Sequence, residues 1–277
     1  MNSETAIRFT DIGHGYRRGE WVLRGINGLV RHGEVFAILG PNGRGKTTLI
    51  NILLGVLAPR EGQVITHGAT GFVPQLFVPP FPYQVLDTVL MGRARHVGFL
   101  RTPGRHDRDV AHAALEELDL THLAERPITE LSGGQRQMVM LARALASEAD
   151  ILILDEPASA LDLHNQSVIL DLIGRLADER ELTILFTTHQ PQHALAVADS
   201  AMLLTDSALP VTGPVDQVMT EEMLAQLYGI PLRRVRVEHQ GRTEDSFVPL
   251  FGARVRRRAR EIHELPTAPA DKPPIHP

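Results

Sequence analysis

Lysine is nearly absent from this sequence, and one of its two lysines stands in a glycine-rich loop. Of 28 basic residues only Lys46 and Lys272 are lysines, so a folded position that keeps lysine is expected to need an ammonium group. Lys46 lies in GPNGRGKTT, which matches the pattern G-x-x-x-x-G-K-[ST] of loops that bind phosphate through backbone N–H groups. We predict that Lys46 reaches the β- and γ-phosphates of a nucleotide and that Thr47 binds Mg²⁺; a glycine turn with a chance lysine is the alternative. The loop consists of Gly40, Pro41, Asn42, Gly43, Arg44, Gly45, Lys46, Thr47 and Thr48.

Two adjacent carboxylates follow a short apolar run further along the chain. Ile151–Leu154 reads as a buried strand, and Asp155 and Glu156 come directly after it. In a parallel α/β sheet, the carboxyl ends of the strands form the edge where ligands bind. Asp155 fits a Mg²⁺ ligand that acts through water, and Glu156 fits a base that polarises an attacking water. A strand that ends in a solvated acidic turn is the alternative.

A third segment is typical of the start of a helix. Ser132 and Gln135 have the spacing of a capping box, and apolar residues recur behind them on one helical face. The N–H groups at this helix start would form a second anion site, separate from Lys46. Taken alone, the segment reads as a well-capped helix, but beside the other two motifs it indicates nucleotide chemistry. Its residues are Leu131, Ser132, Gly133, Gly134 and Gln135.

The elements that must position these residues alternate between strands and helices. Four short apolar runs read as strands, and amphipathic stretches such as Leu161–Arg180 read as helices between them. This order predicts an α/β fold with a mostly parallel sheet. Ile7–Val30 is β-like and polar, which predicts an antiparallel edge or subdomain, and Gln84–Ala149 predicts a helical insertion. The predicted strands are Val35–Leu39, Ile151–Leu154, Thr183–Thr187 and Ala201–Leu204.

Composition limits the classes of protein to which the chain can belong. A formal net charge of −5 is unlike that of a general nucleic-acid binder, and the absence of cysteine excludes disulfides and thiolate-bound metals. The apolar runs fall far short of the roughly 20 residues that span a bilayer, and the N-terminus lacks the features of a signal peptide. We therefore expect a cytoplasmic chain. Residues 251–277 are basic and rich in proline, which predicts a disordered tail.

The three motifs together resemble those of the ATP-binding-cassette (ABC) ATPases, and the resemblance extends over about Ile7–Tyr228. The phosphate loop corresponds to the Walker A loop of that family, Asp155 to the Walker B aspartate and Glu156 to the catalytic glutamate. Leu131–Gln135 corresponds to the signature motif. The resemblance implies a P-loop (RecA-like) fold. Its parts would be a core with a β subdomain (residues 1–84 and 150–230), a helical signature subdomain (85–149) and a C-terminal extension (231–277).

The resemblance also assigns residues that no local pattern had marked. Gln75 corresponds to the Q-loop glutamine, which touches Mg²⁺ and relays to the membrane partner. His189 corresponds to the switch histidine that contacts the γ-phosphate, and Tyr16 to the aromatic residue that stacks on adenine. The D-loop would consist of Ser159, Ala160, Leu161 and Asp162.

In this family the catalytic site is shared between two copies of the cassette. They join head to tail, so that the signature motif of one closes over ATP held by the phosphate loop of the other. ATP would therefore close a homodimer, and hydrolysis would reopen it. Two departures from the family pattern, Arg44 and Ala158, remove no group that this chemistry requires.

Within the family, several stretches look like the importer branch for iron chelates and vitamin B12 (type II importers), and two resemble its molybdate/tungstate member. This predicts the ATP-hydrolysing subunit of a bacterial importer at the cytoplasmic face of the inner membrane, with ATP and Mg²⁺ as cofactors. Its partners would be a membrane permease and, indirectly, a periplasmic or surface substrate-binding protein, and no nucleic acid. The branch stretches are Pro80–Arg93, His106–Asp107 and Leu227–Gly229, and the molybdate-like ones are Thr188–Pro191 and Phe247–Leu250.

Two other functions stay open at this point. Soluble ABC ATPases of DNA repair carry long coiled-coil insertions and those of translation carry two cassettes, and this sequence shows neither feature. A phosphate-loop kinase has no use for the signature motif. Among isolated residues, Pro191 between His189 and His193 argues against a metal-binding pair, and Trp21 is more typical of packing than of base stacking.

Overall fold

The computed structural model describes residues 5–98, 101–205, 209–239 and 241–251. Residues 252–277, which hold most of the predicted basic tail, lie outside the described part. Of the helices in the described ranges, none combines the length and the apolar character needed to cross a bilayer. The strands in the described residues form a six-stranded sheet, a three-stranded sheet and a two-stranded hairpin.

The central sheet has its six strands in the order β5-β6-β7-β3-β8-β9. All neighbours run parallel except β8 and β9, which confirms the predicted mostly parallel sheet. Strands β3, β6 and β7 are buried over their whole length, as expected of parallel strands that are covered on both faces. The bounds are β3 Val35–Leu39, β5 Thr70–Val73, β6 Ile151–Leu154, β7 Thr183–Thr188, β8 Ser200–Leu203 and β9 Val211–Pro214.

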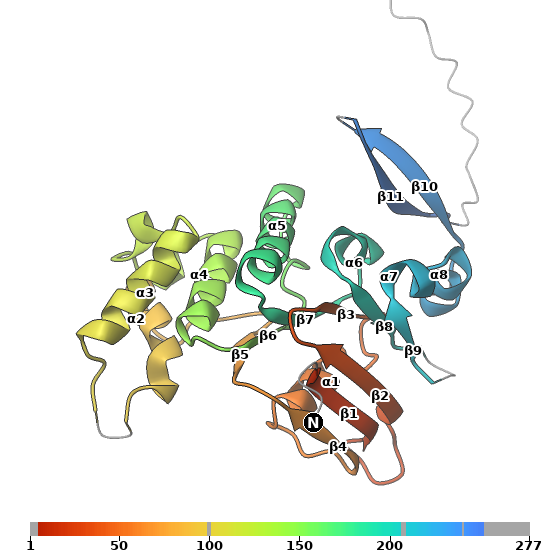
Figure 1. Cartoon of the computed structure of the whole chain (residues 1–277), viewed down its shortest axis with the longest axis horizontal. Helices are drawn as coiled ribbons and strands as arrows, with labels where there is room; N and C mark the ends of the chain where they lie inside the picture. Colours follow the sequence, from red (N-terminus) through yellow and green to blue (C-terminus); the bar gives the residue numbers. More distant parts are fainter. Residues whose placement is uncertain (1–4, 99–100, 206–208, 240, 252–277) are drawn as a thin grey trace, which may run out of the picture.

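Side chains of the central sheet point alternately into two apolar cores. Phe36 and Ile38 of β3 pack with the antiparallel sheet β2-β1-β4 and with helix α1 (Lys46–Leu53), whereas Val35 and Leu39 pack with the other helices. In Figure 1 the antiparallel sheet and α1 lie below the central sheet, and helices α4, α5 and α6 lie above it. The antiparallel strands are β1 Thr5–His14, β2 Leu23–Arg31 and β4 Glu61–Thr66, which confirms the predicted N-terminal antiparallel element.

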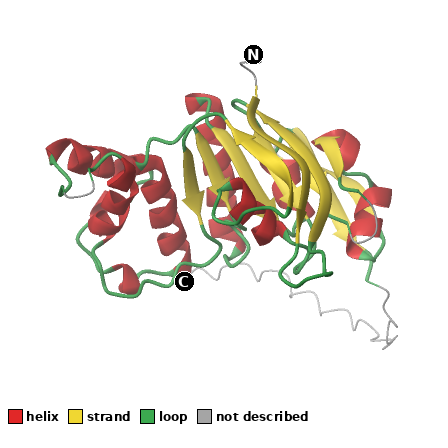
Figure 2. Cartoon of the chain, turned by 90° about the horizontal axis from the view of Figure 1, so that it is seen from below, coloured by secondary structure: helices red, strands yellow, loops and turns green. Residues whose placement is uncertain are grey.

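The chain between β5 and β6 is largely helical, as predicted for the insertion, and this group of helices stands to one side of the sheets (Figure 2). Arg93 holds the group together because its buried guanidinium donates hydrogen bonds to Asp107 and to the carbonyl of Ala146. The bounds are α2 Val85–Leu90, η1 Met91–Arg95, α3 Arg105–Glu117, η2 Thr121–Leu123, η3 Ile128–Glu130 and α4 Gly133–Ala146.

The chain beyond Tyr228 forms a β-hairpin that the sequence pattern had not indicated. Strands β10 and β11 pair antiparallel, and Leu232 and Phe247 anchor the hairpin in the larger core. Figure 1 shows the hairpin extending from the body beyond helix α8. The remaining bounds are α5 Leu163–Arg180, α6 Pro191–Val197, α7 Val215–Val218, α8 Glu221–Tyr228, β10 Leu232–His239 and β11 Arg242–Pro249.

Candidate nucleotide site

The glycine-rich loop joins the end of β3 directly to the start of α1. Gly45 is the N-terminal cap of α1 and has a left-handed backbone with φ +85°, a conformation that other residues adopt only at a cost. A Cβ at this position would also lie 2.8 Å from Cδ2 of Leu23 in β2, so a larger residue would have to displace that side chain. The loop therefore presents backbone N–H groups and a helix N-terminus at the carboxyl edge of the sheet, which is an anion-binding arrangement.

The ammonium group of Lys46 is held inside the chain, where only 5% of the side chain is exposed. Its Nζ donates hydrogen bonds to the carbonyls of Gly40 (2.7 Å) and Pro41 (3.2 Å) and lies 2.9 Å from Oε1 of Glu156. The structure thus brings together the predicted lysine and the predicted catalytic carboxylate, which are far apart in the sequence. In this state Lys46 neutralises Glu156, and phosphate oxygens would compete with Glu156 for the lysine.

Asp155 lies beside Thr47, as a shared magnesium site requires. The Thr47 hydroxyl donates to Oδ2 of Asp155 at 2.9 Å, and the hydroxyl of Thr187 donates to Oδ1 at 2.7 Å. A hydroxyl and a carboxylate are the hard oxygen donors that Mg²⁺ prefers, with phosphate oxygens and water completing its shell. These two residues therefore fit the ion, and no group of three or more His, Cys, Asp or Glu side chains suited to a metal occurs elsewhere in the described ranges.

Thr187 is a site residue that the sequence reasoning missed. Besides bonding Asp155, its hydroxyl accepts a hydrogen bond from the backbone N–H of Glu156 at 2.8 Å. Strands β6 and β7 pair so that Leu154 lies opposite Phe186, which puts the next residues, Asp155 and Thr187, side by side. The parallel register of two predicted strands was the signal that could have identified Thr187.

Glu156 is contacted by both remaining catalytic candidates. Nδ1 of His189 lies 2.9 Å from its Oε2, and Nε2 of Gln75 donates to the same oxygen at 3.3 Å. Burial alone would raise the pKa of Glu156, but the hydrogen bonds and charges of Lys46 and His189 outweigh it and leave the pKa lowered. Its backbone is left-handed with φ +47°, a strained conformation for a non-glycine residue. The carboxylate is therefore charged and held in one place.

Tyr16 lies beside the first turn of α1, where a base bound next to the phosphate loop would be expected. Its hydroxyl bonds to that of Thr48 at 3.0 Å, and 65% of the residue is exposed. The ring of His14 meets it edge-on, with 5.4 Å between the ring centres. The exposed aromatic surface is compatible with the predicted stacking on adenine.

The signature segment begins helix α4, away from the phosphate loop. Ser132 caps the helix through its Oγ, which accepts from the N–H of Gln135, and Oε1 of Gln135 accepts from the N–H of Ser132 in return. The predicted capping box is confirmed. Gly134 packs so closely on helix α5 that a Cβ there would lie 2.8 Å from Cγ of Asn165. Leu131 is buried, whereas Ser132 and Gly133 face solvent.

The predicted D-loop connects Glu156 to helix α5. The Ser159 hydroxyl donates to the carbonyl of Glu156 at 3.1 Å, and Asp162 caps α5 by accepting from the N–H of Asn165 at 2.9 Å. Hydrogen bonds from Asn165 lower the pKa of Asp162. Ala160 and Leu161 line a small cavity that they share with Glu156 and other residues. The predicted D-loop is thus placed between the predicted catalytic carboxylate and the residue that packs on Gly134.

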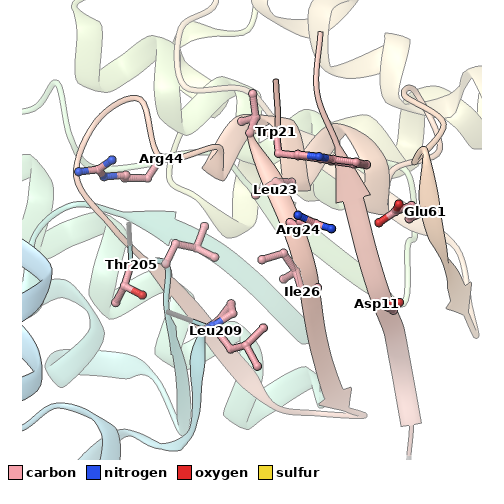
Figure 3. A pocket seen from close by; sticks show the side chains of 13 residues that line it. Asp11, Trp21, Leu23, Arg24, Ile26, Arg44, Glu61, Thr205 and Leu209 are labelled. Atoms are coloured by element: carbon pink, nitrogen blue, oxygen red, sulfur yellow. The ribbon is translucent and has the colours of Figure 1, made fainter. Parts of the chain in front are cut away.

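A separate cavity of about 600 Å³ lies between the antiparallel sheet and the residues that follow β8 (Figure 3). Of the predicted ATP-binding residues it includes only Arg44, so it is distinct from the site around Lys46. The guanidinium carbon of Arg24 lies 5.4 Å from the centre of the Trp21 ring in the cavity wall. This contact is a cation–π interaction, and 39% of Trp21 stays exposed.

His193 is a buried residue that supports the site through hydrogen bonds. Its ring nitrogens lie within hydrogen-bond distance of the Thr188 hydroxyl (3.2 Å) and of Oε1 of Gln166 (3.3 Å). Burial, followed by the nearby charge of His189, lowers the pKa of His193 to about 4. His193 is therefore neutral at physiological pH, and its two nitrogens are occupied by protein groups.

Comparison with known sequences places this geometry in a family. The chain matches the family described as "ABC transporter" over residues 23–159. It is 41% identical to the "Molybdate import ATP-binding protein MolC" of Haemophilus influenzae over 246 residues, which cover 89% of this chain and 97% of that protein. It is 38% identical to the "Manganese transport system ATP-binding protein MntB" of Bacillus subtilis, over 75% of this chain and 86% of that protein.

Comparison with solved structures agrees with the sequence matches. A structure described as a metal-chelate type ABC transporter in an inward-facing conformation has a TM-score of 0.85 and 41% identity, over 90% of this chain and 98% of that chain. A dimeric bacterial ABC transporter cassette has a TM-score of 0.66 and 27% identity, over 76% of this chain and 98% of that chain. The predicted P-loop fold is thereby confirmed. The chain belongs to the ABC transporter family, as one of its ATP-binding subunits, which are ATPases coupled to transport.

Proposed function

We propose that the chain hydrolyses ATP with Glu156 as the general base. The contacts of the Glu156 carboxylate with Lys46, His189 and Gln75 support this assignment. Phosphate oxygens bound at the loop draw Lys46 away from Glu156 because they offer the lysine a stronger negative charge. The freed carboxylate then polarises the attacking water. His189 and Gln75 contact Glu156 and would lie beside the γ-phosphate of bound ATP. Thr47 and Asp155 would hold Mg²⁺, which when bound would neutralise the charge that develops on the phosphates.

The signature segment acts on ATP bound by a second copy of the chain. Its cap side chains bond to each other's backbone, and a Cβ built on Gly133 meets no atom within 4 Å, so this helix start is open to an incoming group. A head-to-tail pair would bring the segment of one chain to the phosphate loop of the other. The likeness to a dimeric cassette supports this arrangement.

A membrane permease docks beside Gln75. Directly after this residue the chain exposes apolar side chains, among them Val78 (72% exposed) and Phe81 (60% exposed). An exposed apolar surface of this kind is typical of an interaction site. Since Gln75 contacts Glu156, a partner on this surface could sense the state of the nucleotide. Residues 85–149 would move with it as a helical subdomain, relative to a core made of residues 1–84 and 150–230.

The transported substrate is an oxyanion such as molybdate or a metal chelate, and the chain works at the cytoplasmic face of the inner membrane with a substrate-binding protein outside. The molybdate-import and metal-chelate transport relatives support this choice. Of the two substrates we favour molybdate, because the Haemophilus relative matches over nearly its whole length.

Uptake by cells tests this function. Cells that lack the chain should accumulate at least tenfold less molybdate at nanomolar supply, and the wild-type chain should restore uptake while Glu156→Gln should not. Molybdenum content measured by mass spectrometry gives the result. Normal molybdate accumulation with a loss of iron-chelate or manganese uptake would reassign the substrate, and normal uptake of all three would contradict a role in import.

A matched pair of variants separates coupling from hydrolysis. Val78→Asp and Phe81→Asp place a charge on the exposed apolar surface but touch none of the nucleotide-binding residues. The purified variants should hydrolyse ATP at the wild-type rate and fail to restore uptake. Wild-type molybdate uptake by both variants would show that this surface is not the docking site.

A further inference from the structure

One stretch that resembles the importer branch and two that resemble its molybdate/tungstate member lie close together in the fold. They are the end of α8 (Leu227–Gly229), the segment that joins β7 to α6 (Thr188–Pro191), and the end of β11 with the residue after it (Phe247–Leu250). The chemistry of ATP hydrolysis assigns a role only to His189 among them. Of the other residues, Tyr228 bonds to the short connection that carries this histidine, and Phe247 bonds to the first turn of the helix that follows it.

Tyr228 holds the backbone of His189. It is the last residue of α8, which ends there because Gly229 adopts a left-handed conformation with φ +69° and turns the chain into β10. The Tyr228 hydroxyl donates to the carbonyl of His189 at 2.9 Å. Burial, followed by the charge of Glu156, raises the pKa of Tyr228. The phenol is therefore protonated, and available as a donor, throughout the physiological range.

A second tether fixes the same connection from the hairpin side. Nε2 of Gln192, in the first turn of α6, donates to the carbonyl of Phe247 at 2.7 Å. Phe247 is 1% exposed, so the hairpin carbonyl is itself anchored in the core. His189 lies in a two-residue connection between β7 and α6, and the two tethers fix the helix end and the hairpin around it.

We propose that Tyr228 is a positioning residue for His189, and that α8 and the hairpin form a clamp that aligns its imidazole with Glu156. The argument rests on the proposed role of His189 in hydrolysis. The imidazole can keep its 2.9 Å contact with the carboxylate only if the backbone that carries it stays in place. Because small misplacements of catalytic groups slow reactions strongly, one hydrogen bond to this carbonyl is enough to affect the rate.

The test is a double-mutant cycle on the full-length chain. Tyr228→Phe removes one oxygen and should lower kcat about tenfold with little change in KM for ATP, because ground-state binding by the phosphate loop is untouched. In a His189→Ala background, Tyr228→Phe should have no further effect, although the backbone carbonyl is still present. Single-turnover reactions followed for hours measure the slow rates of the His189 variants.

A control variant and the other outcomes make the test decisive. Ser147→Ala removes another buried hydroxyl, which bonds to the carbonyl of Ala144 far from the nucleotide, and should leave kcat unchanged. Wild-type turnover by Tyr228→Phe, or an equal loss in both backgrounds, would overturn the positioning role. Full activity of His189→Ala would instead refute the proposed role of that histidine. If Tyr228→Phe has a lower melting temperature than Ser147→Ala, Gln192→Leu takes its place. This variant removes the other tether, and its kcat is compared in the wild-type and His189→Ala backgrounds in the same way.

Discussion

Glu156→Gln should hydrolyse ATP about 10³-fold more slowly than the wild-type chain, because an amide cannot accept the proton that a general base removes. The geometry of the site is preserved, since glutamine has the same shape and can still bond to His189 and Gln75. Single-turnover hydrolysis with excess protein measures the chemical step directly. A rate within tenfold of wild type would show that another group acts as the base.

The same substitution should leave ATP binding intact or strengthen it. In the structure Glu156 holds Lys46 at 2.9 Å, so phosphate must displace a carboxylate before it can bind the lysine. Glutamine removes that competing charge and makes Lys46 available. Titration with a fluorescent ATP analogue should therefore give a dissociation constant equal to or below that of the wild type, and weaker binding would contradict the competition.

Lys46→Ala should weaken ATP binding about 100-fold, which corresponds to about 2.7 kcal/mol and is typical of losing hydrogen bonds to a charged group. The chain should also lose about 3 kcal/mol of stability, because Glu156 is left as a buried carboxylate without its main partner. Calorimetric titration and urea unfolding measure the two effects. Unchanged affinity would refute the assignment of Lys46 to the phosphates.

The double variant Lys46→Ala/Glu156→Gln separates these two effects. It carries no buried charge at this position, so most of the lost stability should return while ATP affinity stays low. The pKa of Glu156 is lowered in the folded chain, so its stabilising contribution is present above the ordinary pKa of a glutamate and is lost as the pH falls through the lowered value. Glu156→Gln should therefore show a smaller loss of stability with acid than the wild type.

The parts of the site that follow from local sequence were predictable. Strands β3 and β6 have the predicted bounds because a strand covered on both faces is a continuous apolar run. The phosphate loop, the capping box at Ser132 and the two carboxylates after β6 each depend on residues that are close in sequence. The ion pair between Lys46 and Glu156 joins two such motifs, and only the parallel sheet brings them together.

Other features depend on long-range packing and had no local signal. Strand β4 is largely exposed, so its sequence lacks the apolar alternation that marks a strand. In the hairpin, arginines alternate with Val235 and Val237, and this charged pattern resembles a solvated tail unless the anchors Leu232 and Phe247 are recognised. The tether from Tyr228 to His189 joins residues that only the folded chain brings into contact.

Sedimentation velocity of Glu156→Gln with ATP and Mg²⁺ tests most directly whether two copies share each nucleotide. The variant hydrolyses ATP very slowly, so it should convert from monomer to dimer as ATP is added and remain monomeric with ADP. Adding Ser132→Arg puts a bulky cation at the open start of α4, and this double variant should bind ATP with the same affinity but stay monomeric. A Glu156→Gln chain that stays monomeric when saturated with ATP, or a double variant that dimerises equally well, would contradict the shared site.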